Sequence, residues 1–408
     1  MSLYFKNSLW IMLEKIALNF GGLIAYVLVS NYLGPDKFGL ISFAISLTLI
    51  PITISQWGAN HVVSNYTLID KSKSISIIYG SLHFRILIFI TSSLLIYLFL
   101  LYNNKGLYNS NVILVFLISH IFIGLDIYQF YFLSSNNSKI NALSSLLSRT
   151  IAILLRVLFV YLSLEVYWFS FPFLVFGIIN FYIKSRKVKG LNNEIKKPIL
   201  KDFIFNGFPY LLSSLLTIVY MKVNDYLIIS MVDMKSLAIY NVALTLGFAW
   251  TFIPQSFSLS FLNKALSCNN FDKSRKELFK THLFVCALSI PIIIFIFFFS
   301  KDIIGLLFSD SYSNASEILP LLSIAGLFSI LGVFNNRIIG YFEEGKSYLY
   351  KKVFVTSIIS LFIGWFLVSS YGLIGAVYSL CITELFSFTV ANYFFKRGLI
   401  FKIHFNLR

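Results

Sequence analysis

Apolar residues in this chain form blocks long enough to cross a membrane. Residues 79–101, 112–133 and 284–299 contain almost no charged side chain. About 20 mainly apolar residues span a bilayer as a helix, and only helices and closed barrels satisfy every backbone polar group there. The pattern predicts an all-α integral membrane protein of about twelve helices, over residues 8–30, 38–61, 77–101, 111–133, 142–164, 167–184, 203–231, 237–262, 279–299, 315–339, 350–370 and 372–395.

The connections between these blocks carry most of the charge. If residue 1 is cytoplasmic, 23 Lys and Arg lie in cytoplasmic connections and four in outward ones. Because cytoplasmic connections are enriched in Lys and Arg, we expect a multi-pass protein with both termini in the cytoplasm. A polar, basic segment at 185–202 is expected to be a cytoplasmic linker between an N-terminal lobe, 1–184, and a C-terminal lobe, 203–408. Each lobe contains six of the expected helices.

Composition excludes other classes of protein. The chain is 58% hydrophobic and 12% charged, with a mean hydropathy of +0.80, unlike a water-soluble domain. Its net charge of +16 would suit nucleic acid, but the positive residues are dispersed among short connections, so no nucleic-acid partner is expected. The three cysteines show no paired spacing, so neither a disulfide framework nor a metal site is indicated.

The two halves share a weak repeat. Four positions recur 199 residues later: Ser42, Ala44, Ser46 and Gln56 correspond to Asn241, Ala243, Thr245 and Gln255. In the first half Ser42, Ser46, Gln56 and Asn60 share one helix face, and polar side chains are costly against lipid. This face therefore lines a wet cavity or forms hydrogen bonds between helices. The repeat itself is either structural or a chance match between Ser- and Leu-rich helices.

Two arginines lie two turns apart inside the span 142–164. The forked guanidinium groups of Arg149 and Arg156 suit bidentate binding of phosphate oxygens, so a pyrophosphate or another extended anion is the predicted ligand. Arg149 has the alternative of reaching the cytoplasmic interface. The same snorkelling is expected of Arg85 and Arg337.

Other spans also contain charges. Of Glu14 and Lys15, adjacent in the first span, one is expected to line the cavity and the other to snorkel. Lys222 and Asp225, at positions i and i+3, are placed to neutralise each other. Glu384 stands alone near mid-span and is a candidate proton relay. Asp126 and His120 are further candidates.

Two stretches carry a family resemblance. The opening, NSLWIMLEKIALNFGGLIAYVLVSNYLGPDKFGLISFAISL, resembles the start of the polysaccharide flippases, which translocate O-antigen or capsular repeat units. Its specific parts are Leu-Glu-Lys at 13–15 and YLGPxxFGxxxxA at 32–44. Residues 222–246 resemble the corresponding stretch of the second half, with Asp225 at the family's acidic position. These flippases belong to the multidrug/oligosaccharidyl-lipid/polysaccharide exporter superfamily, as do multidrug and toxin extrusion transporters.

The resemblance implies a transporter, not an enzyme. It implies two six-helix lobes around a central cavity, alternating access, and an undecaprenyl-pyrophosphate-linked oligosaccharide moved across the bacterial inner membrane. It also implies proton or sodium coupling, as in an antiporter, and a polysaccharide polymerase and chain-length regulator as partners in making O-antigen, lipopolysaccharide or capsule. The alternatives are a related exporter of drugs or other lipid-linked substrates, and a membrane polysaccharide polymerase. The connection at 300–314 is short for the catalytic loop of a polymerase.

This resemblance assigns roles to the polar residues. The pyrophosphate is expected to bind Arg149, Arg156 and Lys15 beside Glu14. Sugars are expected to contact Gln56, Asn60, Asn241 and Gln255. A proton or cation at Asp225 or Glu384, with Lys222 nearby, is expected to couple transport to an ion gradient.

Overall fold

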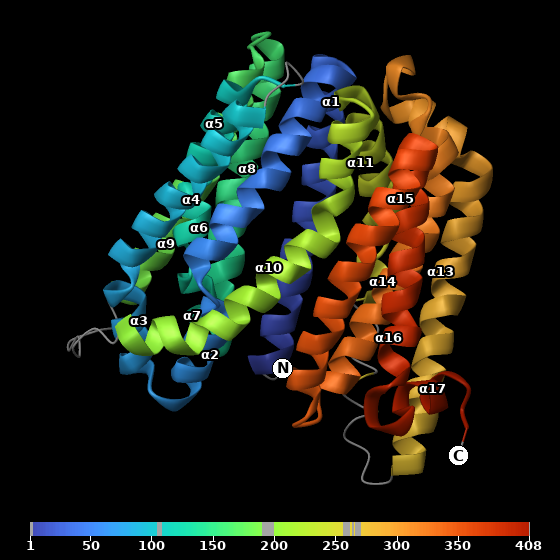
Figure 1. Ribbon diagram of the computed structural model, residues 1–408. Helices are drawn as coiled ribbons and strands as arrows, with labels where there is room; N and C mark the ends of the chain where they lie inside the picture. The colour runs from blue at the N-terminus through green and yellow to red at the C-terminus, as the bar shows by residue number, and fades with distance from the viewer. Residues whose placement is uncertain are drawn as a thin grey trace. The chain divides into compact units, whose positions relative to one another are not determined.

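A computed structural model describes residues 3–103, 108–189, 200–255, 262, 265 and 271–407, with side chains omitted for 3–20, 271 and 272. These residues form helices and no strand (Figure 1). In chain order the helices are α1 (Leu3–Gln56), α2 (Ala59–Ile69), α3 (Lys71–Gly80), α4 (Leu82–Asn103), α5 (Ser110–Ser119), α6 (Ile121–Leu125), α7 (Tyr128–Ser134), α8 (Ser138–Tyr161), η1 (Val166–Ser170), α9 (Phe171–Lys189), α10 (Leu200–Met231), α11 (Met234–Ala249), α13 (Phe271–Leu307), η2 (Asp310–Tyr312), α14 (Ala315–Gly340), α15 (Gly345–Phe388), α16 (Val390–Tyr393), η3 (Phe395–Arg397) and α17 (Leu399–His404).

Two of the longest helices are helical hairpins broken at a glycine. In α1 the break is Gly34, at φ 72°, followed by Pro35. In α15 it is Gly372, at φ 58°, a left-handed conformation that favours glycine. The arms of α15 fold back on each other, because Gly364 of the first arm lies beside Ser379 of the second. The hydroxyl of Tyr348, at the start of α15, also donates to Ala391 O of α16 at 2.8 Å. Each hairpin therefore supplies two membrane crossings joined by almost no loop.

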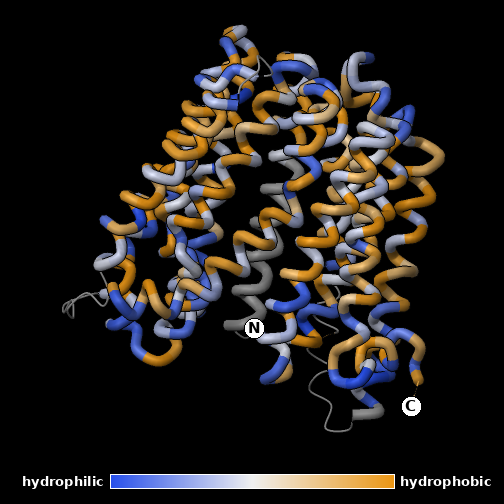
Figure 2. Tube along the Cα trace, viewed as in Figure 1, coloured by the Kyte–Doolittle hydropathy of each residue, from blue (hydrophilic) through white to orange (hydrophobic). Residues whose placement is uncertain are grey.

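The described helices have the length and composition of membrane spans. Nine segments in the described part of the chain qualify, and two of them contain the hairpins of α1 and α15. The shorter apolar helix α11 falls in the predicted eighth span. Apolar residues dominate the middle of the long helices, and polar residues gather toward their ends (Figure 2). The predicted all-helical membrane fold is confirmed.

The chain divides into two compact units, residues 1–218 and 219–408. This division falls inside α10 and not in the expected linker at 185–202, whose flanks are helical to Lys189 and from Leu200. Residues 190–199 lie outside the described chain. The division of the transport machinery into lobes 1–184 and 203–408 stays a prediction.

The beginning of α10 belongs to the first unit because it packs on the corner between α1 and α2. Trp57 and Gly58 turn the chain there with φ of 46° and 70°. The indole Nε1 of Trp57 donates to Ile204 O at 3.0 Å, and Lys73 pairs with Asp202 at 3.3 Å. Gly207 approaches Trp57 so closely that a methyl group would not fit between the two backbones.

We expect Gly375→Ala to lower the thermal unfolding midpoint in detergent. Its Cβ would meet Leu367 O at 2.0 Å, and backbone atoms cannot yield cheaply, so overpacking should cost about 1–3 kcal/mol. Gly305→Ala is the matched control, since nothing lies within 4 Å of its added Cβ. Equal midpoints for the two variants would contradict the close packing of the α15 arms.

Candidate functional site

The two predicted arginines of α8 lie on aromatic rings of α9. Arg149 Cζ is 5.5 Å from the centroid of Phe176, and Arg156 Cζ is 4.6 Å from that of Phe173. The guanidinium of Arg156 makes no hydrogen bond or ion pair with any described residue. A cation on a ring face is attracted by the ring quadrupole, while the N–H groups at its edge stay available. At Arg156 the arrangement holds a positive charge in a spanning helix without consuming its donors.

His120 extends this column of stacked groups. Its ring stacks on Phe173, the same ring that Arg156 covers, with the two ring centroids 4.6 Å apart. One ring nitrogen, Nδ1, lies 2.8 Å from Phe116 O, which holds the imidazole in place. The positive charges of Arg149 and Arg156 act on each other. An anion with several oxygens would relieve that repulsion.

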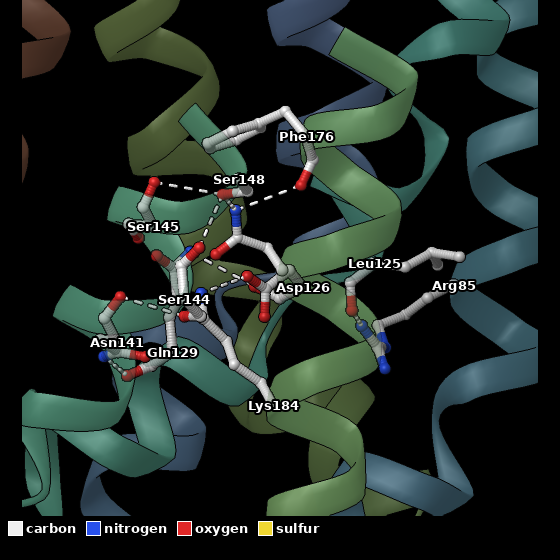
Figure 3. A network of polar contacts seen from close by, with 11 residues as sticks. Arg85, Leu125, Asp126, Gln129, Asn141, Ser144, Ser145, Ser148, Phe176 and Lys184 are labelled. Atoms are coloured by element: carbon white, nitrogen blue, oxygen red, sulfur yellow. Dashed lines mark hydrogen bonds and ion pairs between the residues drawn. The ribbon is translucent and has the colours of Figure 1, made fainter. Parts of the chain in front are cut away.

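A buried ion pair joins α9 to the segment between α6 and α7. Lys184 Nζ lies 2.6 Å from Asp126 Oδ2, and both side chains are more than nine-tenths buried (Figure 3). The predicted span 167–184 ends at Lys184, beside the basic linker at 185–202, where burial of a charge was not expected. Its partner lies 58 residues earlier, so no local pattern connects the two. Burial of either charge alone is costly, which is why they are found together.

Polar side chains of α8 and α9 surround this pair. Asn141 Nδ2 donates to Gln129 O at 2.9 Å, and Asn180 donates to the hydroxyl of Ser148. Around this ion pair, three buried oxygens accept no hydrogen bond from any described residue: Asp126 Oδ1, Asn141 Oδ1 and Asn180 Oδ1. They provide acceptors for buried water.

Arg85 is fully buried, contrary to the expected snorkelling. Its Nη1 donates to Leu125 O at 2.8 Å (Figure 3). Its Nε donates to Ser81 Oγ at 3.2 Å. The short helix α6 ends at Leu125, and the last carbonyls of a helix have no partner within it. Arg85 therefore caps a helix break, which explains its charge structurally. Arg337 is exposed, as snorkelling requires.

The polar stripe of the second span has a mixed outcome. Ser46 is buried, and its hydroxyl donates to Ser42 O at 3.0 Å within the helix. Gln56 is half-buried, whereas Asn60 lies beyond the end of α1, is exposed, and accepts a hydrogen bond from the amide of His61. Asn241 and Gln255 of the second half are half-buried, and the amide of Asn241 donates to Leu237 O. The side chains of Glu14 and Lys15 lie outside the described residues.

The predicted coupling residues share the second unit. Lys222 Nζ lies 2.9 Å from Asp225 Oδ2, so the i, i+3 pairing in α10 is present. Glu384, on the second arm of α15, accepts a hydrogen bond from the hydroxyl of Tyr220 and is buried. Each of the two carboxylates therefore has a polar partner on α10: Lys222 for Asp225 and Tyr220 for Glu384.

Lys352 is a buried cation that was not among the charges named in the predicted spans, although it lies at the start of the span 350–370. It lies on the first arm of α15, 6% exposed, and its Nζ donates to Asn336 Oδ1 at 2.6 Å. Its charge acts on Glu384. The only sequence signal was its position at the start of an apolar block. Two cations, Lys222 and Lys352, thus accompany the carboxylates Asp225 and Glu384 in helices α10 and α15 of the second unit.

Comparison with known proteins identifies the class. A sequence profile for the family described as "Polysaccharide biosynthesis protein" matches residues 4–266, so the chain belongs to that family. None of the curated proteins compared with the chain matches it.

Solved structures share the fold. An inward-facing multidrug resistance MATE family transporter of the MOP superfamily superposes with a TM-score of 0.72 at 13% identity, covering 95% of this chain and 94% of that one. The lipid II flippase MurJ, in an inward closed conformation, gives 0.71 at 17% identity, covering 97% and 90%. A MOP superfamily transporter from Pyrococcus furiosus, described as having reversed binding-pocket polarity, gives 0.62 at 15% identity, covering 98% and 95%. The chain has the fold of these transporters.

We expect Lys184→Met to destabilise the protein strongly, because Asp126 would remain buried without its cation. Breaking one half of a buried pair costs about 3–5 kcal/mol, so the thermal midpoint in detergent should fall by several degrees. Lys187→Met, at an exposed position of the same helix, should leave the midpoint unchanged.

The double variant Lys184→Met with Asp126→Asn tests the cause. Neutralising both residues removes the uncompensated charge, so the midpoint should recover part of the loss. A double variant no more stable than Lys184→Met would show that the ion pair is not the reason for the effect.

Proposed function

We propose that this protein is a flippase that moves a lipid-linked oligosaccharide across the bacterial inner membrane. Membership of a polysaccharide biosynthesis family and the fold shared with MurJ and MATE transporters support transport of a bulky substrate. The substrate we propose is an undecaprenyl-pyrophosphate-linked repeat unit of O-antigen or of capsular polysaccharide. The cytoplasm is the side of entry and of both termini.

Arg156 is the observation on which this proposal depends. Its guanidinium lies inside a spanning helix, stacked on Phe173, with no hydrogen-bond acceptor or carboxylate among the described residues. A charge in a membrane span needs a reason, and structural arginines such as Arg85 find carbonyl partners. Open N–H donors beside a second arginine fit a pyrophosphate, which offers several oxygens and more than one negative charge. A neutral drug would not require them.

The proposed site includes the remaining polar positions of the spans. Lys15, beside Glu14, would add to the positive charge at the pyrophosphate. Gln56, Asn60, Asn241 and Gln255 would contact sugar hydroxyl groups, for which amide side chains are both donors and acceptors. Polysaccharide polymerase and chain-length regulator would receive the product on the far side.

Transport by alternating access requires a substrate that binds the two states differently. To move an equilibrium from 1:99 to 99:1, a ligand must favour one state by about 5.5 kcal/mol. We propose that a proton or sodium ion at Glu384 or Asp225 contributes to that difference. Both carboxylates lie beside cations, Lys352 and Lys222, so neutralising a carboxylate releases a lysine charge inside the unit.

We expect Arg156→Gln to abolish complementation of a flippase-deficient strain at normal protein level. Loss of a charge-assisted hydrogen-bond partner costs about 1.5–3 kcal/mol, so binding of undecaprenyl pyrophosphate to the purified protein should weaken about tenfold or more. Native mass spectrometry of the detergent-solubilised protein measures the binding. Arg156→Lys should recover only part of it, because a lysine lacks the fork.

Arg186→Gln is the matched control. Arg186 lies on α9 and also covers an aromatic ring, Tyr182, at 5.3 Å, but it is exposed at the helix end. It should complement fully. Wild-type activity and lipid binding in Arg156→Gln would refute the proposed site, whereas retained transport of a drug with no lipid binding would favour the multidrug exporter.

We expect Glu384→Gln to remove the dependence of transport on a pH gradient. A glutamine has the shape of a protonated glutamate but cannot release a proton. Flipping of a fluorescent lipid-linked glycan in proteoliposomes, with and without a gradient, measures this dependence. Glu343→Gln, an exposed carboxylate before α15, should keep it. Unchanged stimulation in Glu384→Gln would exclude Glu384 as the coupling residue.

A further inference from the structure

The second unit ends in a short helix that is separated from the last span by a sharp turn. Lys396, Arg397 and Gly398 have positive φ, of 42°, 54° and 83°, so the chain turns between α16 and α17 instead of continuing as one helix. The helix α17 has six residues and is about 9 Å long, which is too short to cross a bilayer. It lies at the end of the unit where α13 begins, and it contacts α13 (Figure 1).

One face of α17 is fixed to the unit. Leu399, Ile400 and Ile403 are buried in an apolar cluster together with residues of α13 and α14. On the same side, His404 Nε2 lies 3.1 Å from Asn335 Nδ2 of α14. Because these contacts hold the inner face, they also fix the direction in which the outer face points.

The outer face carries exposed aromatic rings. Phe401, in α17, and Phe405, directly after it, are 40% and 57% exposed, and their ring centroids lie 4.7 Å apart. Phe394, before the turn, is 78% exposed. A group of exposed rings on an ordered segment indicates an interaction surface, because each ring in water is unfavourable.

Positive charges lie among these rings. Arg397 and Lys402 are exposed, and neither forms an ion pair with a residue in the described part of the chain. Lys396 covers the ring of Phe342, with Nζ 4.2 Å from its centroid, and lies 3.9 Å from a carboxylate oxygen of Glu344. The surface therefore combines aromatic rings with an excess of positive charge, which is typical of segments that lie in the headgroup layer of a membrane.

This surface continues the lipid-facing side of the last span. Exposed apolar side chains recur every three to five residues along the second arm of α15 and along α16, at Tyr378, Ile382, Leu385, Val390 and Phe394. The first four lie within the candidate membrane span Gly345–Tyr393, where exposed apolar side chains contact lipid. Phe394 directly follows the end of that span. The aromatic surface thus begins where the lipid-facing side ends, and a lipid headgroup layer is the occupant that this position favours.

We propose that segment 394–405 is an interfacial anchor that binds anionic phospholipid. Its three exposed rings, Phe394, Phe401 and Phe405, enter the boundary between headgroups and acyl chains. Arg397 and Lys402 contact lipid phosphate groups. Because α17 is fixed to α13 and α14, this anchor ties the end of the second unit to the charge of the adjacent leaflet. The proposal requires a membrane-spanning second unit and does not depend on the flippase assignment.

Fluorescence quenching tests the position of the rings. Phe405→Trp adds one tryptophan to the five of the chain, and wild type in the same lipid nanodiscs supplies the background emission. We expect the added emission to be quenched by phospholipid brominated near the headgroup and to be shielded from aqueous acrylamide. Quenching by acrylamide, without quenching by the brominated lipid, would show that this face meets water or a soluble partner and would overturn the proposal.

Removal of the two unpaired charges tests the preference for anionic lipid. A Lys or Arg near an anionic surface strengthens binding about fivefold. In Arg397→Gln with Lys402→Gln, the phosphatidylglycerol concentration that gives half of the lipid-induced rise in the thermal midpoint should therefore increase about tenfold or more. Phosphatidylcholine should give wild type and variant the same midpoint. Salt at 1 M, where the Debye length is about 3 Å, should remove most of the difference between the two lipids.

Lys346→Gln with Lys351→Gln is the matched control. Both lysines are exposed near the start of α15 in the same unit, and their replacement removes the same number of charges. This variant should respond to phosphatidylglycerol as wild type does. An equal loss of response in the two double variants would show general attraction to the whole surface and would overturn the anchor. If Arg397→Gln with Lys402→Gln does not accumulate, Lys402→Gln alone, at an exposed helical position, should show about half of the loss on a logarithmic scale, and a wild-type response would refute the proposal.

Discussion

A charge inside a membrane-spanning helix has no water to return to, and this constraint organises the polar interior of the protein. Desolvation of a single ion costs several kcal/mol, so buried charges occur with partners. Lys184 reaches across to Asp126, Lys222 to Asp225, and Lys352 to an amide oxygen of Asn336. Because each contact links different turns or helices, the charges also fix how the helices of a unit pack against one another.

Arg156 departs from this rule. Its guanidinium is supported by the ring face of Phe173 and makes no hydrogen bond or ion pair with a described residue. Incomplete pairing of a charge inside a spanning helix is costly, so an anion gains most by binding at this position. Arg85, which is fully paired, has only a structural role.

Local patterns predicted what depends on neighbours in sequence. Hydropathy located the spans, and the i, i+3 spacing located the pair of Lys222 and Asp225. The same reasoning did not predict the burial of Lys184, since a basic run follows it and its partner Asp126 lies in a distant segment, between α6 and α7. The burial of Lys352 and of Arg85 was not predicted, for a similar reason. Their burial is decided by side chains and backbone carbonyls that only the tertiary fold brings together.

The turns at Gly34 and Gly372 have a consequence for how such proteins diversify. Each joins two crossings through a single left-handed residue, so this end of each hairpin offers no loop that could lengthen or change. Loops usually carry the variation that alters recognition while a scaffold stays fixed. Here a change of specificity at these turns would have to arise from substitutions within the helices themselves, where each one is also constrained by packing.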